Sequence, residues 1–187
     1  MDERERRFGQ IYESYYAAVS AYARRRLTDG DLAQDAVSET FLVAWRRLAD
    51  VPTGSDTLPW LYGVARRVVA NQRRGNLRRG ELSSRLAREL PLHEDVDAGV
   101  LVGDERRTVL SALSRLREVD QELLRLAAWE ELSHREIGLV VGCSEATVAV
   151  RLHRARGRLG KEIQKGLPRA GHDTRSEPPE PHGKALD

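Results

Sequence analysis

Residues 132–156, LSHREIGLVVGCSEATVAVRLHRAR, contain the pattern that decides the fold. Ser133 and Glu136 have the spacing of a capping box, which predicts the start of a short helix. Gly142 and Cys143 predict a tight turn, and the serine that follows them is suited to cap a second helix. A short helix, a tight turn and a longer basic helix form the helix-turn-helix arrangement, whose second helix enters the major groove of DNA.

The second helix of this unit has one apolar and one basic side. Apolar residues recur at steps of three and four at positions 148, 152, 155, 159 and 163. Only the first turns of such a helix reach base edges. The candidates for reading bases are therefore Glu145, Ala146, Thr147, Ala149, Val150, Arg151, His153 and Arg154. Arg158, Lys161 and Lys165 lie further along and are expected to contact phosphates or solvent. The alternative interpretation is an ordinary amphipathic helical hairpin.

Three more helices are predicted upstream. The first has an apolar stripe at positions 8, 11, 12, 15, 19 and 22, and the second spans about residues 32–48. Residues 50–59 are rich in proline, glycine and small polar side chains, which predicts a loop. The third helix runs from Trp60 to about Arg74, and Gly75 is expected to end it together with the asparagine that follows.

The periodicity predicts an all-α protein of two small helical domains joined by a flexible linker. We expect domain boundaries at 1–75 and 104–165, with a linker at 76–103 and a disordered, proline-rich tail at 166–187. The second domain is the helix-turn-helix domain. No alternating strand pattern occurs in the sequence.

Composition and charge exclude several classes of protein. The 187 residues contain one cysteine, which excludes an intramolecular disulfide framework and suits a reducing cytoplasm. No apolar run approaches the roughly 20 residues needed to cross a bilayer, and the charged N-terminus is not a secretory signal. The net charge is +2, yet residues 61–80 hold six arginines and no acid, and residues 146–165 are also strongly basic. Two basic segments indicate that a polyanion is bound at two places.

Three segments together resemble a known family. Residues 31–45 (DLAQDAVSETFLVAW), residues 59–74 (PWLYGVARRVVANQRR) and the helix-turn-helix resemble, in this order, the extracytoplasmic-function (ECF) sigma factors of the sigma-70 family. The resemblance covers about residues 8–165. It implies a polymerase-docking helix, a helix that recognises the promoter −10 element and a domain that reads the −35 element.

The resemblance also implies roles for individual residues. Polymerase docking is assigned to Asp35 and Glu39, with Phe41 and Trp45 supporting the helix. The loop that captures an unstacked base of the −10 strand contains Thr53, Ser55 and Asp56. The face that follows this strand comprises Trp60, Arg66, Arg67, Asn71, Arg73 and Arg74, although an aromatic residue such as Trp60 is more often part of a core. A positive groove with pockets for flipped bases suits a single strand. In the −35 helix, Ala149 and Val150 replace the usual basic and small polar pair, which leaves apolar contact with thymine methyl groups as one option.

The implied function is non-enzymatic. The partners are the clamp of core RNA polymerase, promoter DNA and an anti-sigma factor, and the protein would act as a monomer within the holoenzyme, without membrane insertion. No cofactor is expected, and Cys143 lacks the CxxC or HExxH spacing of a metal site. Two rival classes stay open: a stand-alone helix-turn-helix regulator, which needs a dimer interface, and a nucleic-acid-processing enzyme, for which the sequence contains no catalytic cluster.

Overall fold

The computed structural model describes residues 2–83 and 103–166, which form an all-α fold without strands in these ranges. The helices are α1 (Glu3–Arg24), α2 (Gly30–Arg46), α3 (Thr57–Ser83), α4 (Gly103–Ser114), α5 (Glu118–Ala128), α6 (His134–Val141) and α7 (Glu145–Gly166), and the short 3-10 helices are η1 (Leu48–Asp50) and η2 (Gly54–Asp56). The predicted tail from 167 onward and most of the predicted linker lie outside the described residues. The all-α expectation is confirmed.

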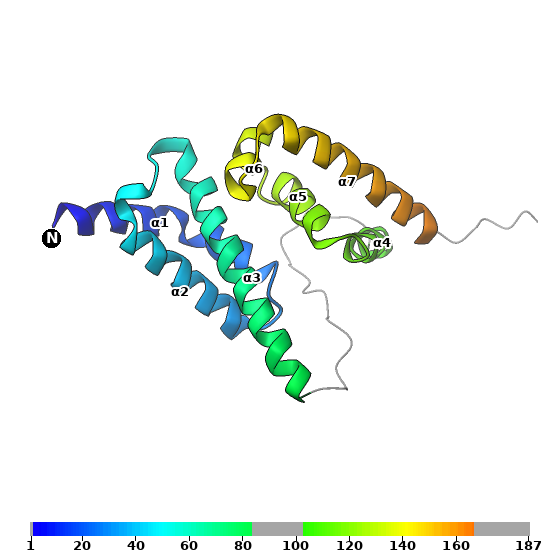
Figure 1. Cartoon of the computed structure of the whole chain (residues 1–187), viewed down its shortest axis with the longest axis horizontal. Helices are drawn as coiled ribbons and strands as arrows, with labels where there is room; N and C mark the ends of the chain where they lie inside the picture. The colour runs from blue at the N-terminus through cyan, green and yellow to red at the C-terminus, as the bar shows by residue number, and fades with distance from the viewer. Residues whose placement is uncertain (1, 84–102, 167–187) are drawn as a thin grey trace, which may run out of the picture.

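The first three helices pack side by side (Figure 1). The side chain of Asp29 accepts hydrogen bonds from the backbone N–H groups of Asp31 and Leu32, which caps α2 as the turn sequence predicts. The buried face of α1 includes Val19 and Tyr22, and the buried face of α2 includes Phe41. These faces follow the apolar stripes seen in the sequence.

The third helix differs from the sequence prediction at both ends. It begins at Thr57, inside the predicted loop, and it continues through Gly75 and Asn76 to Ser83, so the predicted end of this helix was wrong. A glycine inside a helix costs about 1 kcal/mol relative to alanine, which is too little to stop a helix that is already propagating. The first eight residues of the predicted linker are therefore helical.

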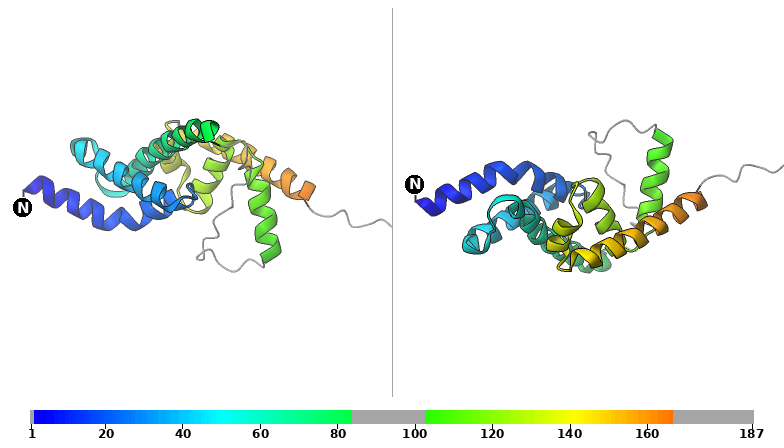
Figure 2. Two further views of the ribbon diagram at one scale, coloured as in Figure 1. Left: turned by 90° about the horizontal axis from the view of Figure 1, so that it is seen from below. Right: turned by 90° about the horizontal axis from the view of Figure 1, so that it is seen from above.

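The last four helices form the second unit, and this unit packs directly against the first. Figures 1 and 2 show α6 beside α3, with α7 leading away from the contact. The approach is close: a Cβ atom added at Gly63 on α3 would lie 3.5 Å from the backbone oxygen of Val140 on α6. One apolar cluster extends from Ile11 in α1 to Ala155 in α7. The core is therefore continuous across the two units.

Candidate nucleic-acid interface

The helix-turn-helix forms as the sequence predicts. Ser133 and Glu136 make both bonds of the capping box at the start of α6. The helix ends at Gly142, which has φ +74°, a left-handed conformation that glycine adopts without steric cost. Ser144 Oγ then accepts a 3.3 Å hydrogen bond from the backbone N–H of Thr147, which caps α7. The turn is therefore fixed on both sides.

The tightness of this turn depends on a residue that the sequence reading did not single out. The backbone oxygen of Gly138 accepts hydrogen bonds from Gly142 N at 2.8 Å and from Cys143 N at 3.0 Å. A Cβ atom at Gly138 would lie 2.6 Å from the backbone oxygen of Cys143, closer than real Cβ atoms approach. The missing side chain of Gly138 is what lets the two helices approach.

The start of α7 presents most of its candidate base-reading side chains to solvent. The exposed ones are Glu145, Ala146, Val150, Arg151, His153 and Arg154. Thr147 and Ala149 are half-buried, and the Thr147 hydroxyl lies 2.8 Å from Ser144 Oγ. Val148, Leu152 and Ala155 point into the core, so the reading face and the buried face lie on opposite sides of the helix.

Arg158, which was expected to contact phosphate or solvent, is 43% exposed and also forms an ion pair that the sequence did not predict. Its Nη1 donates to both carboxylate oxygens of Asp120, at 2.9 and 2.8 Å. The Asp120 side chain is buried, and its charge therefore needs a partner. Arg158 thus fastens α7 to α5.

The arginines assigned to the −10 strand line one side of α3. Arg67, Asn71 and Arg74 are exposed, and Arg66 and Arg73 are half-buried. Arg74 donates to Asn71 Oδ1 at 2.6 Å. A cavity of about 490 Å³ lies between this side of α3 and the start of α5, and all five side chains line it. The basic face of α3 therefore borders the second unit across this cavity, while Arg67, Asn71 and Arg74 remain exposed to solvent.

The predicted base-capturing loop is also close to the second unit. Thr53 and Ser55 are exposed in and beside η2, and Trp60 is half-buried against the core. Asp56 accepts two 2.8 Å hydrogen bonds from Arg135 on α6, a bidentate ion pair. The hydrogen bond and charge of Arg135 lower the pKa of the Asp56 carboxyl.

The predicted docking face lies on the far side of α2. Asp35 and Glu39 are exposed, Phe41 is buried and Trp45 is half-buried. Beside the two carboxylates, a hollow of about 340 Å³ is lined mainly by aromatic side chains: Phe8, Tyr12, Tyr16, Val37, Ser38, Phe41, Leu42 and Trp45. An acidic edge next to an apolar hollow suits a protein partner rather than DNA.

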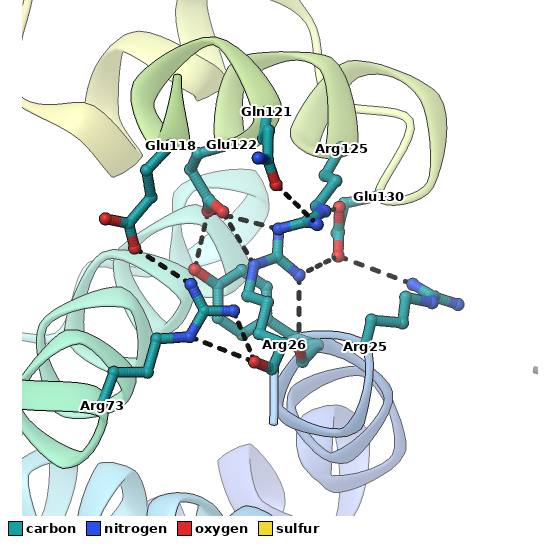
Figure 3. Close-up of polar contacts among 9 residues, drawn as sticks. Arg25, Arg26, Arg73, Glu118, Gln121, Glu122, Arg125 and Glu130 are labelled. Atoms are coloured by element: carbon teal, nitrogen blue, oxygen red, sulfur yellow. Dashed lines mark hydrogen bonds and ion pairs between the residues drawn. The ribbon is translucent and has the colours of Figure 1, made fainter. Parts of the chain in front are cut away.

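A buried cluster of charges joins the two units (Figure 3). Arg26 donates from Nε to Glu122 at 2.9 Å and from Nη1 to Glu130 at 2.8 Å. The side chain of Arg26 is 2% exposed and that of Glu130 is 0% exposed. The Tyr22 hydroxyl donates to Glu122 at 2.8 Å, and the Arg26 guanidinium lies 3.5 Å from the centroid of the Tyr22 ring.

The charges in this cluster stabilise one another. Burial raises the pKa of the Glu122 carboxyl, but the charge and hydrogen bond of Arg26, the hydrogen bond of Tyr22 and the charge of Arg125 together outweigh burial and leave this pKa below its usual value. Burial lowers the pKa of Arg26, whereas Glu122 and the other anionic neighbours raise it, and the net pKa is raised. Both groups are therefore ionised at neutral pH. Burial also raises the pKa of Tyr22, which keeps its hydroxyl protonated as a donor.

Sequence reasoning missed this cluster, although one signal was present. Arg24, Arg25 and Arg26 follow one another at the end of the first helix, and no role was predicted for them. Arg26, however, follows Tyr22 by four positions and so continues the apolar stripe of α1. A charged residue in phase with a buried stripe indicates a buried ion pair, but only the fold shows which carboxylates it meets.

The described residues give no indication of a metal site or a membrane span. Among them, no group of three or more His, Cys, Asp or Glu side chains is placed to hold a metal ion. None of the helices within 2–83 and 103–166 has both the length and the apolar character that crossing a bilayer requires.

Comparison with known families decides the identity. Residues 11–79 match the family model described as Sigma-70 region 2, and residues 106–159 match Sigma-70, region 4. The chain belongs to the sigma-70 family, in its ECF group. The two matches are in the order that the sequence motifs predicted, and they cover both the basic α3 and the helix-turn-helix. The resemblance noted in the sequence is confirmed, and sigma factors of this family are transcription factors.

Individual relatives agree with this placement. The sigma factor is 28% identical over 157 residues to RNA polymerase sigma factor YlaC of Bacillus subtilis (strain 168), covering 83% of this chain and 91% of that protein. It is 28% identical to ECF RNA polymerase sigma factor SigL of Mycobacterium tuberculosis (strain ATCC 25618 / H37Rv), covering 82% of this chain and 87% of that protein.

Solved structures agree as well. The sigma factor RpoE of Bartonella quintana, solved in complex with the anti-sigma factor NepR, is 25% identical with a TM-score of 0.66 and covers 84% of this chain and 96% of its own. CnrH, solved with the cytosolic domain of CnrY, is 22% identical with a TM-score of 0.57, covering 86% of this chain and 90% of its own, and shows the same fold.

Proposed function

We propose that this sigma factor binds core RNA polymerase and directs initiation at promoters through two separate DNA contacts. The first turns of α7 enter the major groove of the −35 duplex. The basic side of α3 and the η2 loop hold the melted −10 strand, and the acidic edge of α2 docks on the polymerase clamp. The observation that carries this proposal is that most of each basic helix falls within a separate sigma-70 region match, in the family's order.

The same proposal assigns the segments of the chain. Residues 1–75 correspond to the docking and −10 domain, 76–103 to the linker, 104–165 to the −35 domain and 166–187 to the tail, with the correction that α3 continues to Ser83. Phosphate contacts from both basic segments supply much of the affinity for DNA, so binding weakens as the salt concentration rises. The protein acts in the cytoplasm, as one copy per holoenzyme, and catalyses no reaction of its own.

An anti-sigma factor is the second proposed partner. The support is the RpoE relative from Bartonella quintana, which was solved with the anti-sigma factor NepR and whose fold covers most of this chain. The apolar hollow between α1 and α2 and the basic side of α3 are the surfaces whose occlusion would prevent function. Binding there would keep the sigma factor from polymerase and DNA.

A stand-alone helix-turn-helix regulator is the alternative that the sequence left open. It is not favoured, because it leaves the match of residues 11–79 to Sigma-70 region 2 unexplained. A regulator of this kind would select promoter duplex without polymerase, whereas a sigma factor changes what the polymerase transcribes.

Run-off transcription tests the proposal. Core RNA polymerase is supplied with fragmented genomic DNA from the host, with and without the protein, and the transcripts are mapped. New discrete start sites support the sigma role, and their shared upstream sequences give both promoter elements. Asp35→Asn/Glu39→Gln should abolish these transcripts and co-elution with polymerase, whereas the charge-matched control Glu3→Gln/Glu13→Gln, on exposed positions of α1, should not. Wild-type protein that neither elutes with nor programmes the polymerase would contradict the proposal.

A further inference from the structure

The cavity between α3 and the start of α5 has the size and the charge of a site for a small anion. Its volume of about 490 Å³ lies within the range of about 300–1,000 Å³ that is usual for small-molecule sites. Two glutamates and five arginines line it, so positive charge is in excess; the arginines are Arg26, Arg66, Arg67, Arg73 and Arg74. A hollow lined mainly by one sign of charge concentrates small ions of the opposite sign.

Three of the five arginines have no negatively charged partner. Arg26 and Arg73 each bind a carboxylate of the second unit, whereas Arg74 donates to a neutral amide oxygen. Within residues 2–83 and 103–166, the side chains of Arg66 and Arg67 have neither a hydrogen bond nor an ion pair. Arg66 is half-buried, and a partly desolvated charge gains more from a bound counterion than an exposed charge does. The α3 side of the cavity can therefore accept further negative charge.

The first turn of α5 forms the opposite wall of the cavity. Glu118, Val119 and Glu122 line it from this side, and Figure 3 shows the two glutamates beside arginines of the first unit. Val119 is 56% exposed, so an apolar surface lies next to the basic one. Arg117, the N-cap residue of α5, makes no side-chain cap hydrogen bond, and uncapped N–H groups at a helix start favour an anion. The α5 wall thus adds an apolar contact and a second, weaker attraction for negative charge.

We propose that this cavity binds a nucleoside polyphosphate, with its phosphate chain on the arginines of α3 and its base against Val119. The phosphate chain supplies the negative charge that three arginines lack, and a guanidinium binds phosphate oxygens through two parallel hydrogen bonds. The nucleoside supplies an apolar surface for Val119, which inorganic phosphate would leave without a contact.

The binding itself does not depend on the proposed function, but its consequence rests on that function. Arg66, Arg67, Arg73 and Arg74 are the side chains proposed to hold the −10 strand. A nucleotide bound to them would keep them from DNA, because one guanidinium cannot bind both sets of phosphates at once. The ligand would therefore lower the fraction of the protein that is able to use its −10 surface.

Isothermal titration calorimetry on the full chain measures the binding directly. The probes are ATP, GTP and inorganic pyrophosphate, in about 0.15 M salt, which screens contacts between exposed charges. At least one nucleoside triphosphate should bind at one site per chain, about tenfold or more tighter than pyrophosphate, because only the nucleotide buries apolar surface. If neither nucleotide binds saturably, or if pyrophosphate binds as tightly as both, the proposal is overturned.

Val119→Glu tests whether the α5 wall belongs to the site, since it puts a carboxylate where the nucleotide would lie. The matched control is Leu139→Glu: Leu139 is 48% exposed on α6, lies outside the cavity lining and undergoes the same change of charge. Val119→Glu should weaken nucleotide binding about tenfold or more, because like charges at close range repel. The control should stay within about twofold of the wild type. If both variants bind alike, the anion lies on exposed arginines alone and the proposal fails.

Glu118→Gln tests the site in the opposite direction. The Glu118 carboxylate is 72% exposed and lies 2.9 Å from Arg73 Nη1, so it competes with the nucleotide for that guanidinium. Its removal should tighten nucleotide binding about two- to fivefold, as expected for an exposed ion pair. Glu105→Gln, which removes the same charge from an exposed position of α4 outside the cavity lining, should not. Unchanged or weaker binding in Glu118→Gln would contradict the proposed position of the phosphates.

The two sets of variants keep the test independent of folding and of the sigma role. Far-UV circular dichroism confirms that the helices of each variant form, and Glu118→Gln still decides the question if Val119→Glu does not fold. Neither titration contains DNA or polymerase. A protein that fails to programme the polymerase can therefore still show the nucleotide site, and a protein without this site can still act as a sigma factor.

Discussion

Replacing Gly138 by alanine tests whether the helix-turn-helix depends on the close approach seen at its turn. The new Cβ atom would lie 2.6 Å from the backbone oxygen of Cys143, whereas ordinary contact begins at 3.4 Å. The obstacle is backbone, which cannot rotate away as a side-chain end can. The two hydrogen bonds that Gly138 O accepts from Gly142 and Cys143 hold this backbone in place.

The expected magnitude is the difference between two terms. Forcing a methyl group into a packed site typically costs about 1–3 kcal/mol. Alanine is favoured over glycine inside a helix by about 1 kcal/mol. Because a gap of about 0.8 Å must be opened against backbone, we place the first term at the upper end of its range. The free energy of unfolding should then fall by about 1–2 kcal/mol, or about 2–8 °C in Tm.

Thermal and urea unfolding followed by circular dichroism measure this change. Gly157→Ala is the matched control, since Gly157 lies within α7, is exposed and has nothing within 4 Å of an added Cβ. The control should raise the stability by up to about 1 kcal/mol. If Gly138→Ala is as stable as Gly157→Ala, the turn does not depend on the missing side chain and the reasoning is refuted.

Four further outcomes are expected. Arg154→Ala should weaken binding to −35 duplex by about 1–3 kcal/mol in gel-shift titrations; an equal loss on scrambled duplex would make Arg154 a phosphate contact instead. Asp120→Ala removes the acceptor of Arg158 and should lower the free energy of urea unfolding by about 1.5–3 kcal/mol. The folded-state pKa of Glu122 lies below its usual value, so its contribution is complete above about pH 4.3 and is lost as the pH falls further; Tm measured from pH 7 to 3 should be flat and then fall, and Glu122→Gln should reduce this fall. Burial, with the nearby Glu130 charge, raises the pKa of Tyr62 to about 12, so stability should decline between about pH 10 and 12 as the unfolded chain ionises first; ultraviolet titration of the tyrosines in wild type and Tyr62→Phe measures this, and a Tyr62 that titrates normally would contradict it.

Local rules explain why much of this protein could be predicted from its sequence. The capping box at Ser133 and the left-handed turn at Gly142 depend on residues within a few positions of one another. The apolar stripes of α1, α2 and α7 follow from the helical period alone. Motif order then identified the sigma-70 family, which the region matches confirmed. The assignment of individual side chains to DNA or polymerase remains a prediction.

Where sequence reasoning failed, residues far apart in the chain were involved, or two effects of similar size competed. Gly75 was expected to end the third helix, because a glycine inside a helix costs free energy and this cost can be judged from the sequence. That α3 nevertheless continues through Gly75 could not be judged in the same way. The ion pair between Arg158 and Asp120 was not predicted, because the two residues lie 38 positions apart in the chain.

The sequence by itself determined the helices, their buried faces, the turn of the DNA-reading unit and the family. Each of these is encoded by spacing within a short window, where the backbone geometry converts residue type directly into position. Only the tertiary structure decided that the basic side of α3 lies beside the second unit, with Arg66 and Arg73 half-buried, and that Arg26 meets Glu122 and Glu130 across 96 and 104 positions. An ion pair of this kind forms only where packing places three side chains together and excludes water, and no pattern within one segment encodes that placement.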